Sequence, residues 1–190
     1  MNLSDLKIDS SWTLFLDRDG VINTRILGGY VQKWEQFEFL PGVPEALKTL
    51  SPEFSRIIVV SNQQGIGKGL MTEEELEILH RKMIAEIERN GGRIDRIYHS
   101  PHLEQEGSVK RKPNVGMALT ARKEFPGINF KRSVMVGDSI SDMIFGRRLK
   151  MVTVFLSENI SQARKSHQFI DFVFPDLISF AETVSGMKIK

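Results

Sequence analysis

The stretch Leu-Phe-Leu-Asp-Arg-Asp-Gly at residues 14–20 ends an apolar run with two carboxylates, Asp17 and Asp19. The run of large side chains that starts at Trp12 predicts a buried strand of a parallel sheet. Gly20 then lets the backbone turn away from the strand. In open α/β sheets ligands bind outside the carboxyl ends of strands, so the two carboxylates lie where chemistry is expected. The alternative at this point is that both residues only form a turn or cap a helix.

Length and composition limit the classes of protein to which the chain can belong. Its 190 residues, 41% of them hydrophobic, predict a single domain over residues 1–190 with a sizeable core. A net charge of +2 is too small to indicate a nucleic-acid or membrane partner. The lack of cysteine excludes disulfides, thiolate nucleophiles and cysteine-ligated zinc. The charged N-terminus and the lack of a long apolar run predict a cytoplasmic protein, and a monomer is the default expectation.

Strand and helix patterns alternate along the chain. Apolar, often β-branched runs predict strands at residues 12–16, 57–60, 96–98, 133–136, 152–156 and 172–174. Helical spacing predicts helices at residues 43–50, from Thr72 to before Gly91, through Met117 to Phe125 with Asn114 as cap, at 143–150, and at 175–184 with Pro175 in the first turn. This alternation predicts an α/β fold with a mostly parallel sheet covered by helices on both faces.

Two irregular segments follow strand ends. Segment 21–40 is long for a connection from strand to helix, and its four aromatic residues predict an ordered loop that shapes a pocket. Segment 61–69 carries polar side chains and three glycines, which allow the backbone to approach an anion closely. Its spacing matches neither the P-loop nor the dinucleotide fingerprint, so the glycines alone identify no nucleotide site.

A parallel sheet brings the ends of its strands to one edge, where four sets of polar side chains can meet. The sets are Asp17 and Asp19, Ser61 and Asn62, Arg111 and Lys112, and Asp138 and Asp142. Carboxylates in one cleft repel one another unless a cation joins them, and hard oxygen ligands favour Mg²⁺. A lysine adds positive charge for an anion, and a serine adds a hydroxyl donor. These groups predict phosphoryl transfer in which one Asp attacks phosphorus and a second carboxylic acid protonates the leaving oxygen.

The chain resembles the phosphatases of the haloacid dehalogenase superfamily, whose four motifs occur here in order. They are Asp17-Arg18-Asp19-Gly20-Val21, Ser61, Lys112, and Gly137-Asp138 followed by Asp142. The resemblance implies a Rossmann-like fold in which Asp17 is the nucleophile and Asp19 the general acid and base. Ser61 and Lys112 would stabilise the phosphoryl group.

The same resemblance implies a Mg²⁺ site. Its ligands would be the Asp17 carboxylate, the main-chain carbonyl of Asp19 and the Asp138 carboxylate. Asp142 is expected either just outside the metal ligands or as a helix cap.

Within the superfamily the chain is similar to the branch that contains heptose bisphosphate phosphatases and histidinol-phosphate phosphatases. The matching segments are residues 17–23, 29–31, 61–66, 100–102 and 111–117. The pair Gly116-Met117 and the segment Gly29-Tyr30-Val31 favour the heptose enzymes. Members of this branch have no large cap domain, so modest loops would enclose the substrate. The residues implied to contact it are Asn62, Gln63, Arg111, Arg25 and Tyr30.

The sequence departs from that branch at positions near the substrate entrance. The branch carries a zinc loop of the form Cys-Pro-His and Cys-X-Cys, but here those positions are Ser100-Pro101-His102 and Ser108-Val109-Lys110. A structural zinc normally has four protein ligands, so we expect no zinc and a loop 99–110 held by packing and hydrogen bonds. The loop before Tyr30 is also longer than usual, and Ser139 replaces a lysine that contacts substrate in the heptose enzymes.

The leading hypothesis is therefore a Mg²⁺-dependent phosphomonoesterase that acts on a small phosphorylated metabolite, with a heptose bisphosphate as first choice. Histidinol phosphate is the second choice. A nucleic-acid 3′-phosphatase is a further alternative, because such domains share the Asn62-Gln63 element and the Arg-Lys-Pro segment, but a dense basic stripe does not accompany them. A hypothesis of another class is a binding module that keeps the fold without turnover.

Overall fold

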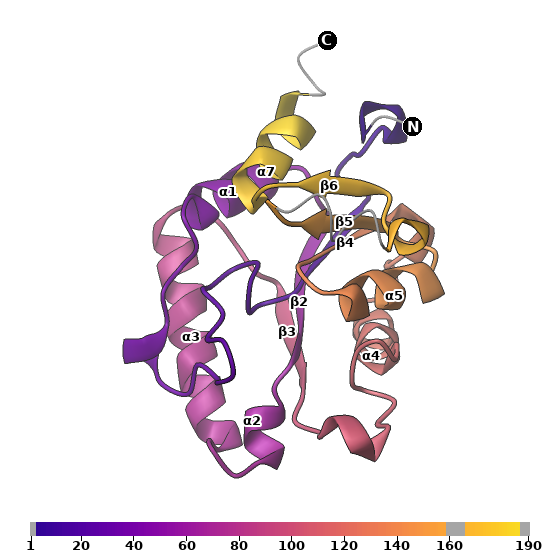
Figure 1. The fold of residues 1–190 in the computed structure, drawn as a ribbon. Helices are drawn as coiled ribbons and strands as arrows, with labels where there is room; N and C mark the ends of the chain where they lie inside the picture. The colour runs from indigo at the N-terminus through magenta and orange to yellow at the C-terminus, as the bar shows by residue number, and fades with distance from the viewer. Residues whose placement is uncertain (1–2, 159–165, 187–190) are drawn as a thin grey trace.

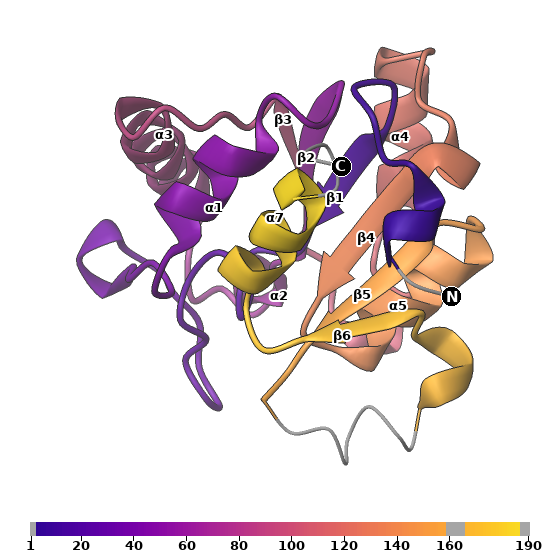
Figure 2. The ribbon, with the colours of Figure 1, turned by 90° about the horizontal axis from the view of Figure 1, so that it is seen from above.

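The computed structural model describes residues 3–158 and 166–186. Its centre is a six-stranded sheet of order β3-β2-β1-β4-β5-β6 in which every pairing is parallel (Figures 1 and 2). The strands are β1 (Thr13–Leu16), β2 (Arg56–Asn62), β3 (Arg96–Ser100), β4 (Ser133–Gly137), β5 (Val152–Leu156) and β6 (Phe172–Phe174). The predicted α/β class is confirmed.

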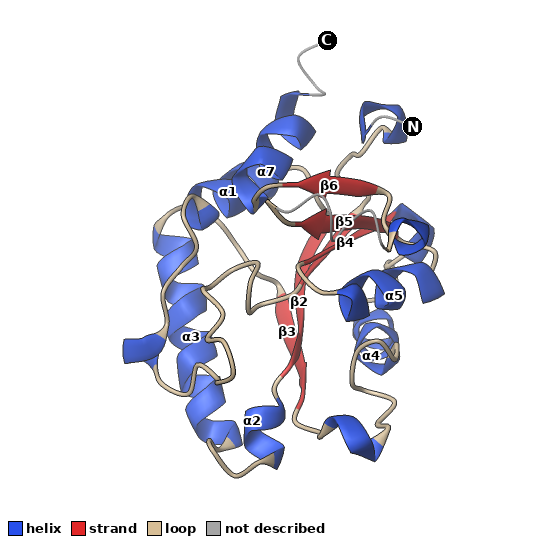
Figure 3. Ribbon diagram, in the orientation of Figure 1, coloured by secondary structure: helices blue, strands red, loops and turns tan. Residues whose placement is uncertain are grey.

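Helices cover both faces of this sheet (Figure 3). They are α1 (Val43–Leu50), α2 (Gln64–Gly67), α3 (Glu73–Arg89), α4 (Gly116–Glu124), α5 (Ile140–Arg148) and α7 (Leu177–Gly186). Helices α1, α3 and α7 pack on one face, and α4 and α5 pack on the other. Short 3-10 turns occur at Leu3–Leu6, Trp34–Gln36, Glu104–Glu106, Phe130–Arg132 and His167–Phe169. Within the described residues, every helix is too short or too polar to cross a membrane.

Strand β1 is buried from both sides, as its apolar run predicts. Leu14 and Leu16 belong to the core under α1, α3 and α7, whereas Phe15 belongs to the core under α4 and α5. All three side chains are fully buried. Because successive strand side chains point to opposite faces, a strand with helices on both sides buries consecutive apolar residues, as Leu14, Phe15 and Leu16 show.

Two helices, α5 and α7, begin at other residues than the sequence predicts. Helix α5 begins three residues earlier than expected, because Ser139 and Asp142 form a capping box. Helix α7 begins at Leu177 rather than at Pro175, because the carboxylate of Asp176 accepts a hydrogen bond from the Ser179 amide at 2.8 Å.

The predicted cap of α4 is also wrong. The N-cap position is Val115, and no side chain caps it. The Asn114 side chain instead donates to the main-chain oxygen of Ser108 at 3.0 Å and accepts from Arg148 at 2.8 Å. Asn114 therefore ties the loop before α4 to its neighbours.

Segment 21–40 is ordered, as its aromatic content predicts. Trp34 stacks on Phe37 with ring centroids 5.0 Å apart, and Phe37 meets Phe39 edge-on at 4.9 Å. Isolated β-bridges join Asn23 to Asp19 and to Phe39. These contacts fix the segment beside the carboxyl end of β1.

Candidate active site

The predicted site residues meet at the carboxyl ends of β1, β2 and β4. The chain runs from β1 outward to β2 on one side and later returns to β4 on the other, so β1 and β4 flank the point at which the strand order reverses. Ligands of open α/β sheets bind at such a point. The Asp17 amide still donates to the main-chain oxygen of Val136 at 3.0 Å, so the sheet holds Asp17 in place. A cavity of about 440 Å³ opens above it.

Lys112 lies at the bottom of this cavity between two carboxylates. Its ammonium is 2.8 Å from Asp17 Oδ1 and 2.6 Å from Asp142 Oδ1, and it donates to the main-chain oxygen of Val60 at 2.7 Å. Burial disfavours its charge, but the attraction of Asp142 and Asp17 outweighs burial and raises the Lys112 pKa. Lys112 is therefore a buried ammonium that faces the cavity.

Burial raises the pKa of Asp17 to about 6, and this effect exceeds the opposing attraction of Lys112. Negative charge from Asp142 and Asp19 adds to the increase. The positive charge of Lys112 therefore does not fully balance the negative charges of Asp17, Asp19 and Asp142.

Asp142 serves two elements at once. Its Oδ2 accepts from the Ser139 amide at 3.2 Å, which closes the capping box of α5. Its Oδ1 contacts Lys112. The close approach needs a glycine at position 137, because a Cβ there would lie 2.3 Å from the Cβ of Asp142. Of the two roles expected for Asp142, the structure places it in the helix cap and beside Lys112.

Three carboxylates form a group that could hold a metal ion. Asp17, Asp138 and Asp142 each offer an oxygen, and these oxygens lie within 4.8 Å of one another. Burial, and next the charge of Asp17, raise the pKa of Asp138 to about 7. Gly20 has a φ of +94°, and a Cβ there would lie 2.0 Å from Asp138 Oδ2, so only glycine leaves room for that carboxylate.

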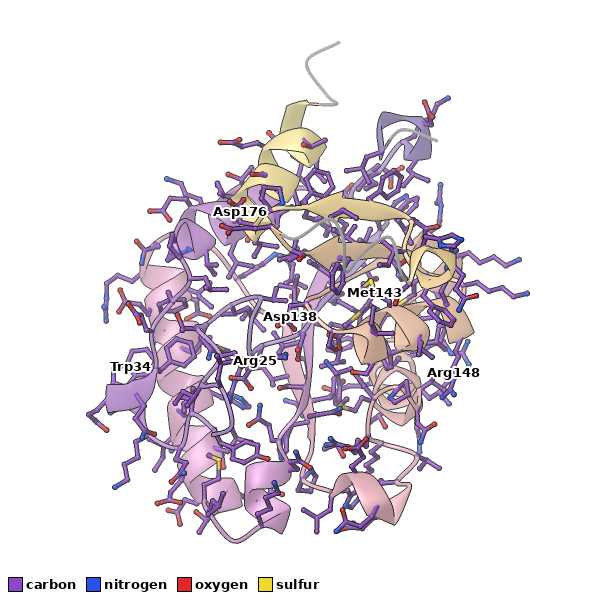
Figure 4. All side chains as sticks on the ribbon, in the orientation of Figure 1. Arg25, Trp34, Asp138, Met143, Arg148 and Asp176 are labelled. Atoms are coloured by element: carbon purple, nitrogen blue, oxygen red, sulfur yellow. The ribbon has the colours of Figure 1, made fainter. Side chains whose placement is uncertain are left out.

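The guanidinium of Arg25 lies among these oxygens. Its Nη2 is 2.7 Å from Asp138 Oδ1, 2.9 Å from the main-chain oxygen of Asp19 and 3.8 Å from Asp17 Oδ2. Figure 4 shows Arg25 and Asp138 side by side near the centre of the molecule. The three oxygens are hard donors of the type that Mg²⁺ prefers, and they already surround a positive charge, so the residues fit a cation.

The Asp19 side chain is held by donors on several sides. Arg18 Nη2 donates to both carboxylate oxygens at 2.8 and 3.0 Å, Asn23 Nδ2 donates at 2.9 Å, and Gln63 Nε2 donates at 2.8 Å. Burial alone would raise the pKa of Asp19, but Arg18 and the other donors outweigh burial and lower it. These donors therefore favour the carboxylate form of Asp19 over its protonated form.

The end of β2 supplies Ser61, Asn62 and Gln63, each in a different position. The Ser61 hydroxyl is buried beside the cavity and accepts from Gln63 Nε2 at 2.6 Å. Asn62 lines the cavity, but its amide group pairs with the Lys112 main chain, donating to the oxygen at 3.0 Å and accepting from the amide at 2.9 Å. The Gln63 side chain is buried, faces Asp19 and Ser61, and is not part of the cavity lining.

Positive and aromatic side chains form the rim of the cavity. Arg25, Tyr30 and Arg111, which are predicted to contact substrate, line the cavity, and Lys68 lines it as well. Lys68 donates to the Tyr30 hydroxyl at 2.9 Å and lies 5.2 Å from the ring centroid. Lys68 is not among the site residues predicted from the sequence, although its position between Gly67 and Gly69 in the polar segment after β2 was a usable signal.

The loop 99–110 is held by hydrogen bonds, as expected. The Gly67 amide donates to the Pro101 oxygen at 3.2 Å, and the Gly116 amide donates to the Val109 oxygen at 2.8 Å. Arg111 Nη1 donates to the His102 oxygen at 3.3 Å. These bonds join the loop to α2 and α4, and the lack of zinc stays a prediction.

Comparisons with known proteins agree with this geometry. A family model described as polynucleotide kinase 3 phosphatase matches residues 14–185. The chain is 42% identical over 132 residues to a D-glycero-alpha-D-manno-heptose-1,7-bisphosphate 7-phosphatase of Mycobacterium bovis. The aligned region covers 70% of this chain and 70% of that relative. The chain is also 40% identical over 138 residues to a D-glycero-beta-D-manno-heptose-1,7-bisphosphate 7-phosphatase of Escherichia coli, covering 68% of this chain and 70% of the relative.

A solved structure has the same architecture. The D,D-heptose 1,7-bisphosphate phosphatase of B. bronchiseptica, complexed with magnesium and phosphate, superposes with a TM-score of 0.81 and 25% identity, over 91% of this chain and 97% of that one. The match of the family model to most of the chain, together with the two relatives, confirms the resemblance described above. The chain therefore belongs to the haloacid dehalogenase superfamily, in the phosphatase family described as polynucleotide kinase 3 phosphatase.

Proposed function

We propose that the protein hydrolyses the 7-phosphate of a D-glycero-D-manno-heptose 1,7-bisphosphate with Asp17 as nucleophile. The observation that carries this proposal is the Asp17 carboxylate, held 2.8 Å from the buried Lys112 ammonium at the bottom of a 440 Å³ cavity. A carboxylate and an ammonium that face a cavity side by side are the groups needed to attack a phosphoryl group and neutralise its oxygens.

In the first step an Asp17 oxygen attacks phosphorus in line with the bond to the sugar oxygen. The bond between phosphorus and the sugar oxygen breaks, and the protonated form of Asp19 donates its proton to that oxygen. The product is an aspartyl-phosphate and a free sugar hydroxyl.

In the second step water attacks the phosphorus of the aspartyl-phosphate and restores Asp17. Asp19 is now a carboxylate and accepts the proton of the water. The donors Arg18, Asn23 and Gln63 lower the Asp19 pKa and so favour this basic form. The proton given up in the first step is thereby regained, and Asp19 returns to its starting state.

Lys112 and Ser61 would hold the phosphoryl oxygens in both steps. The Lys112 ammonium stays charged between Asp17 and Asp142, and it contributes positive charge where the equatorial oxygens become more negative. The Ser61 hydroxyl accepts from Gln63, which leaves its own hydrogen available to a phosphoryl oxygen.

Asp17, Asp138 and the main-chain carbonyl of Asp19 would hold Mg²⁺. The ion would supply positive charge to the phosphoryl oxygens and reduce the repulsion between Asp17 and the incoming phosphate. The grouping of the carboxylate oxygens and the position of Arg25 among them support this ligand set.

A bisphosphate suits the cavity because positive charge lies at its rim as well as at its bottom. Arg25, Lys68 and Arg111 line the rim, where a second phosphate can use their charge. The relatives from M. bovis and E. coli are named as phosphatases of the alpha and the beta anomer, respectively, so both anomers belong in the test. The cytoplasmic location and the monomeric state stay predictions from the sequence.

A panel of phosphate esters tests the substrate. We expect phosphate release, in the presence of Mg²⁺, to have its highest kcat/KM with one anomer of heptose 1,7-bisphosphate, above histidinol phosphate and a 3′-phosphorylated oligonucleotide. Replacing the nucleophile in Asp17→Asn should lower kcat by about 10³-fold or more for every ester.

Two results would contradict the proposal in different ways. A preference for the oligonucleotide that weakens steeply with added salt would identify a nucleic-acid substrate instead. Equal turnover by the wild-type protein and Asp17→Asn would remove Asp17 from the chemistry altogether.

A further inference from the structure

Arg18 is the largest fully buried side chain among the described residues. A buried guanidinium needs partners for its N–H groups, because an unpaired buried charge is costly. Its Nε and Nη2 face Asp19, at 3.3 and 2.8 Å from Oδ1. Its Nη1 points the other way, to Nε2 of His80 at 3.2 Å.

His80 lies on the buried side of α3 and belongs to neither the cavity lining nor the sequence-predicted site. Arginine has donors only, so Nε2 of His80 must accept, and the ring is therefore the neutral tautomer with its hydrogen on Nδ1. Burial, and next the charge of Arg18, lower the pKa of His80 to about 3, which agrees with a neutral ring. The His99 ring lies edge-on to His80 at 6.2 Å and contacts Glu73 rather than Arg18.

We propose that His80 is a positioning residue that fixes the Arg18 guanidinium from α3 and thereby holds the Asp19 carboxylate where it exchanges protons with the substrate. This inference rests on the acid and base role proposed for Asp19. The guanidinium is planar and rigid, so an acceptor at Nη1 sets the direction in which Nε and Nη2 point. Asp19 follows because Arg18 contacts both of its oxygens.

The contact also links the proton-transfer group to the segment that precedes α3. The residues just before this helix include Lys68 at the cavity rim, and Thr72 caps the helix with Glu75. A shift of α3 would therefore move His80 and, through Arg18, Asp19. Small displacements matter at this point, since misplacing a catalytic group by about 1 Å can cost about 100-fold in rate.

The test compares His80→Leu, which removes the acceptor, with His80→Gln, whose amide oxygen can still accept from Arg18. The substrates are p-nitrophenyl phosphate, which has a good leaving group, and phenyl phosphate, which has a poorer one that depends more on a proton from Asp19. Because kcat/KM reports on the first phosphoryl transfer, we expect His80→Leu to lower it about tenfold more for phenyl phosphate than for p-nitrophenyl phosphate. His80→Gln should have kcat/KM values for both esters close to those of the wild type.

His99→Leu is the matched control, because it changes the neighbouring histidine without touching Arg18. It should leave the ratio of the two kcat/KM values as in the wild type. If His80→Leu lowers both esters equally, or neither, the positioning role is wrong. Damage to folding alone would give the equal loss, because it does not distinguish leaving groups.

A measurement without turnover separates this inference from the proposed function. In a ¹H,¹⁵N NMR spectrum the Arg18 Nε–H, assigned by its loss in Arg18→Lys, should exchange slowly with water in the wild type and in His80→Gln but rapidly in His80→Leu. Slow exchange in all three proteins would overturn the inference even if the enzyme is active. An inactive wild type with the expected exchange pattern would instead contradict the proposed function and leave the contact of His80 with Arg18 supported.

Discussion

At the scale of single residues, the Arg25 guanidinium lies among the oxygens proposed to bind the metal ion. Its Nη2 contacts the Asp19 carbonyl and Asp138, which are two of the ligands proposed for Mg²⁺. A Mg²⁺ ion bound at the proposed site would therefore compete with the guanidinium for the same oxygens. Metal binding would release Arg25 toward the cavity that it lines, where the phosphate of a substrate can receive it.

We predict that Arg25→Ala binds Mg²⁺ about two- to fivefold more tightly than the wild type, because an ion pair this exposed is worth at most about 1 kcal/mol. The Arg25 side chain is 42% exposed. Isothermal titration calorimetry in phosphate-free buffer measures the affinity. Arg111→Ala is the control, since Arg111 also lines the cavity but contacts the His102 oxygen. Unchanged or weaker binding by Arg25→Ala would show that Arg25 does not compete with the ion.

At the scale of elements, Asn62 connects the end of β2 to the segment before α4. Its amide group makes both possible bonds with the Lys112 main chain. We predict that Asn62→Ala lowers the free energy of unfolding by about 1–3 kcal/mol, because it leaves two main-chain groups of Lys112 without partners. Urea denaturation measures this change. Asn129→Ala is a control of the same type at an exposed turn and should cost less, and an equal cost would contradict the special role of Asn62.

The elements that could be predicted from the sequence are those in which local pattern and final packing agree. Residues Leu14–Leu16 of strand β1 are all apolar because helices cover both faces of the strand, and the capping box at Thr72 and Glu75 marks the start of α3 as it is observed. Asp17 and Asp138 could be brought together because parallel strands end at one edge, whereas Lys112 follows the loop after β3 and is held beside them by the pairing of its main chain with Asn62.

The parts that could not be predicted depend on contacts between distant segments. Nothing in the local sequence shows that Arg18 turns inward to His80, which lies 62 residues away. Likewise, Asn114 looks like a helix cap, but Arg148 from α5 engages its side chain instead. The order in which helices cover the sheet decides such contacts.

At the scale of the whole molecule, the site gathers negative charge that the fold alone does not neutralise. Burial raises the pKa of Asp17 to about 6. Burial, together with repulsion from the Asp17 charge, raises the pKa of Asp138 to about 7. A carboxyl group whose pKa is higher in the folded state stabilises the fold at low pH. That stability is lost as the pH rises through the folded-state pKa.

We therefore predict that the metal-free protein loses thermal stability as the pH rises from 5 to 8, and that Mg²⁺ restores it more at the higher pH, because the ligands must be deprotonated to bind. Mg²⁺ at about 100 times its Kd should stabilise the fold by about 2.7 kcal/mol at pH 8, which is about 5–10 °C in Tm for a chain of this size. Calorimetry at several pH values, with Mg²⁺ or with a chelator, measures the shift. In Asp138→Asn most of the increase in Tm caused by Mg²⁺ should disappear, since this substitution removes a proposed ligand and one of the repelling charges together. A Mg²⁺ shift of the same size at pH 5 and pH 8 would show that Asp17 and Asp138 are already ionised throughout this range, so that the fold tolerates their charge without the ion.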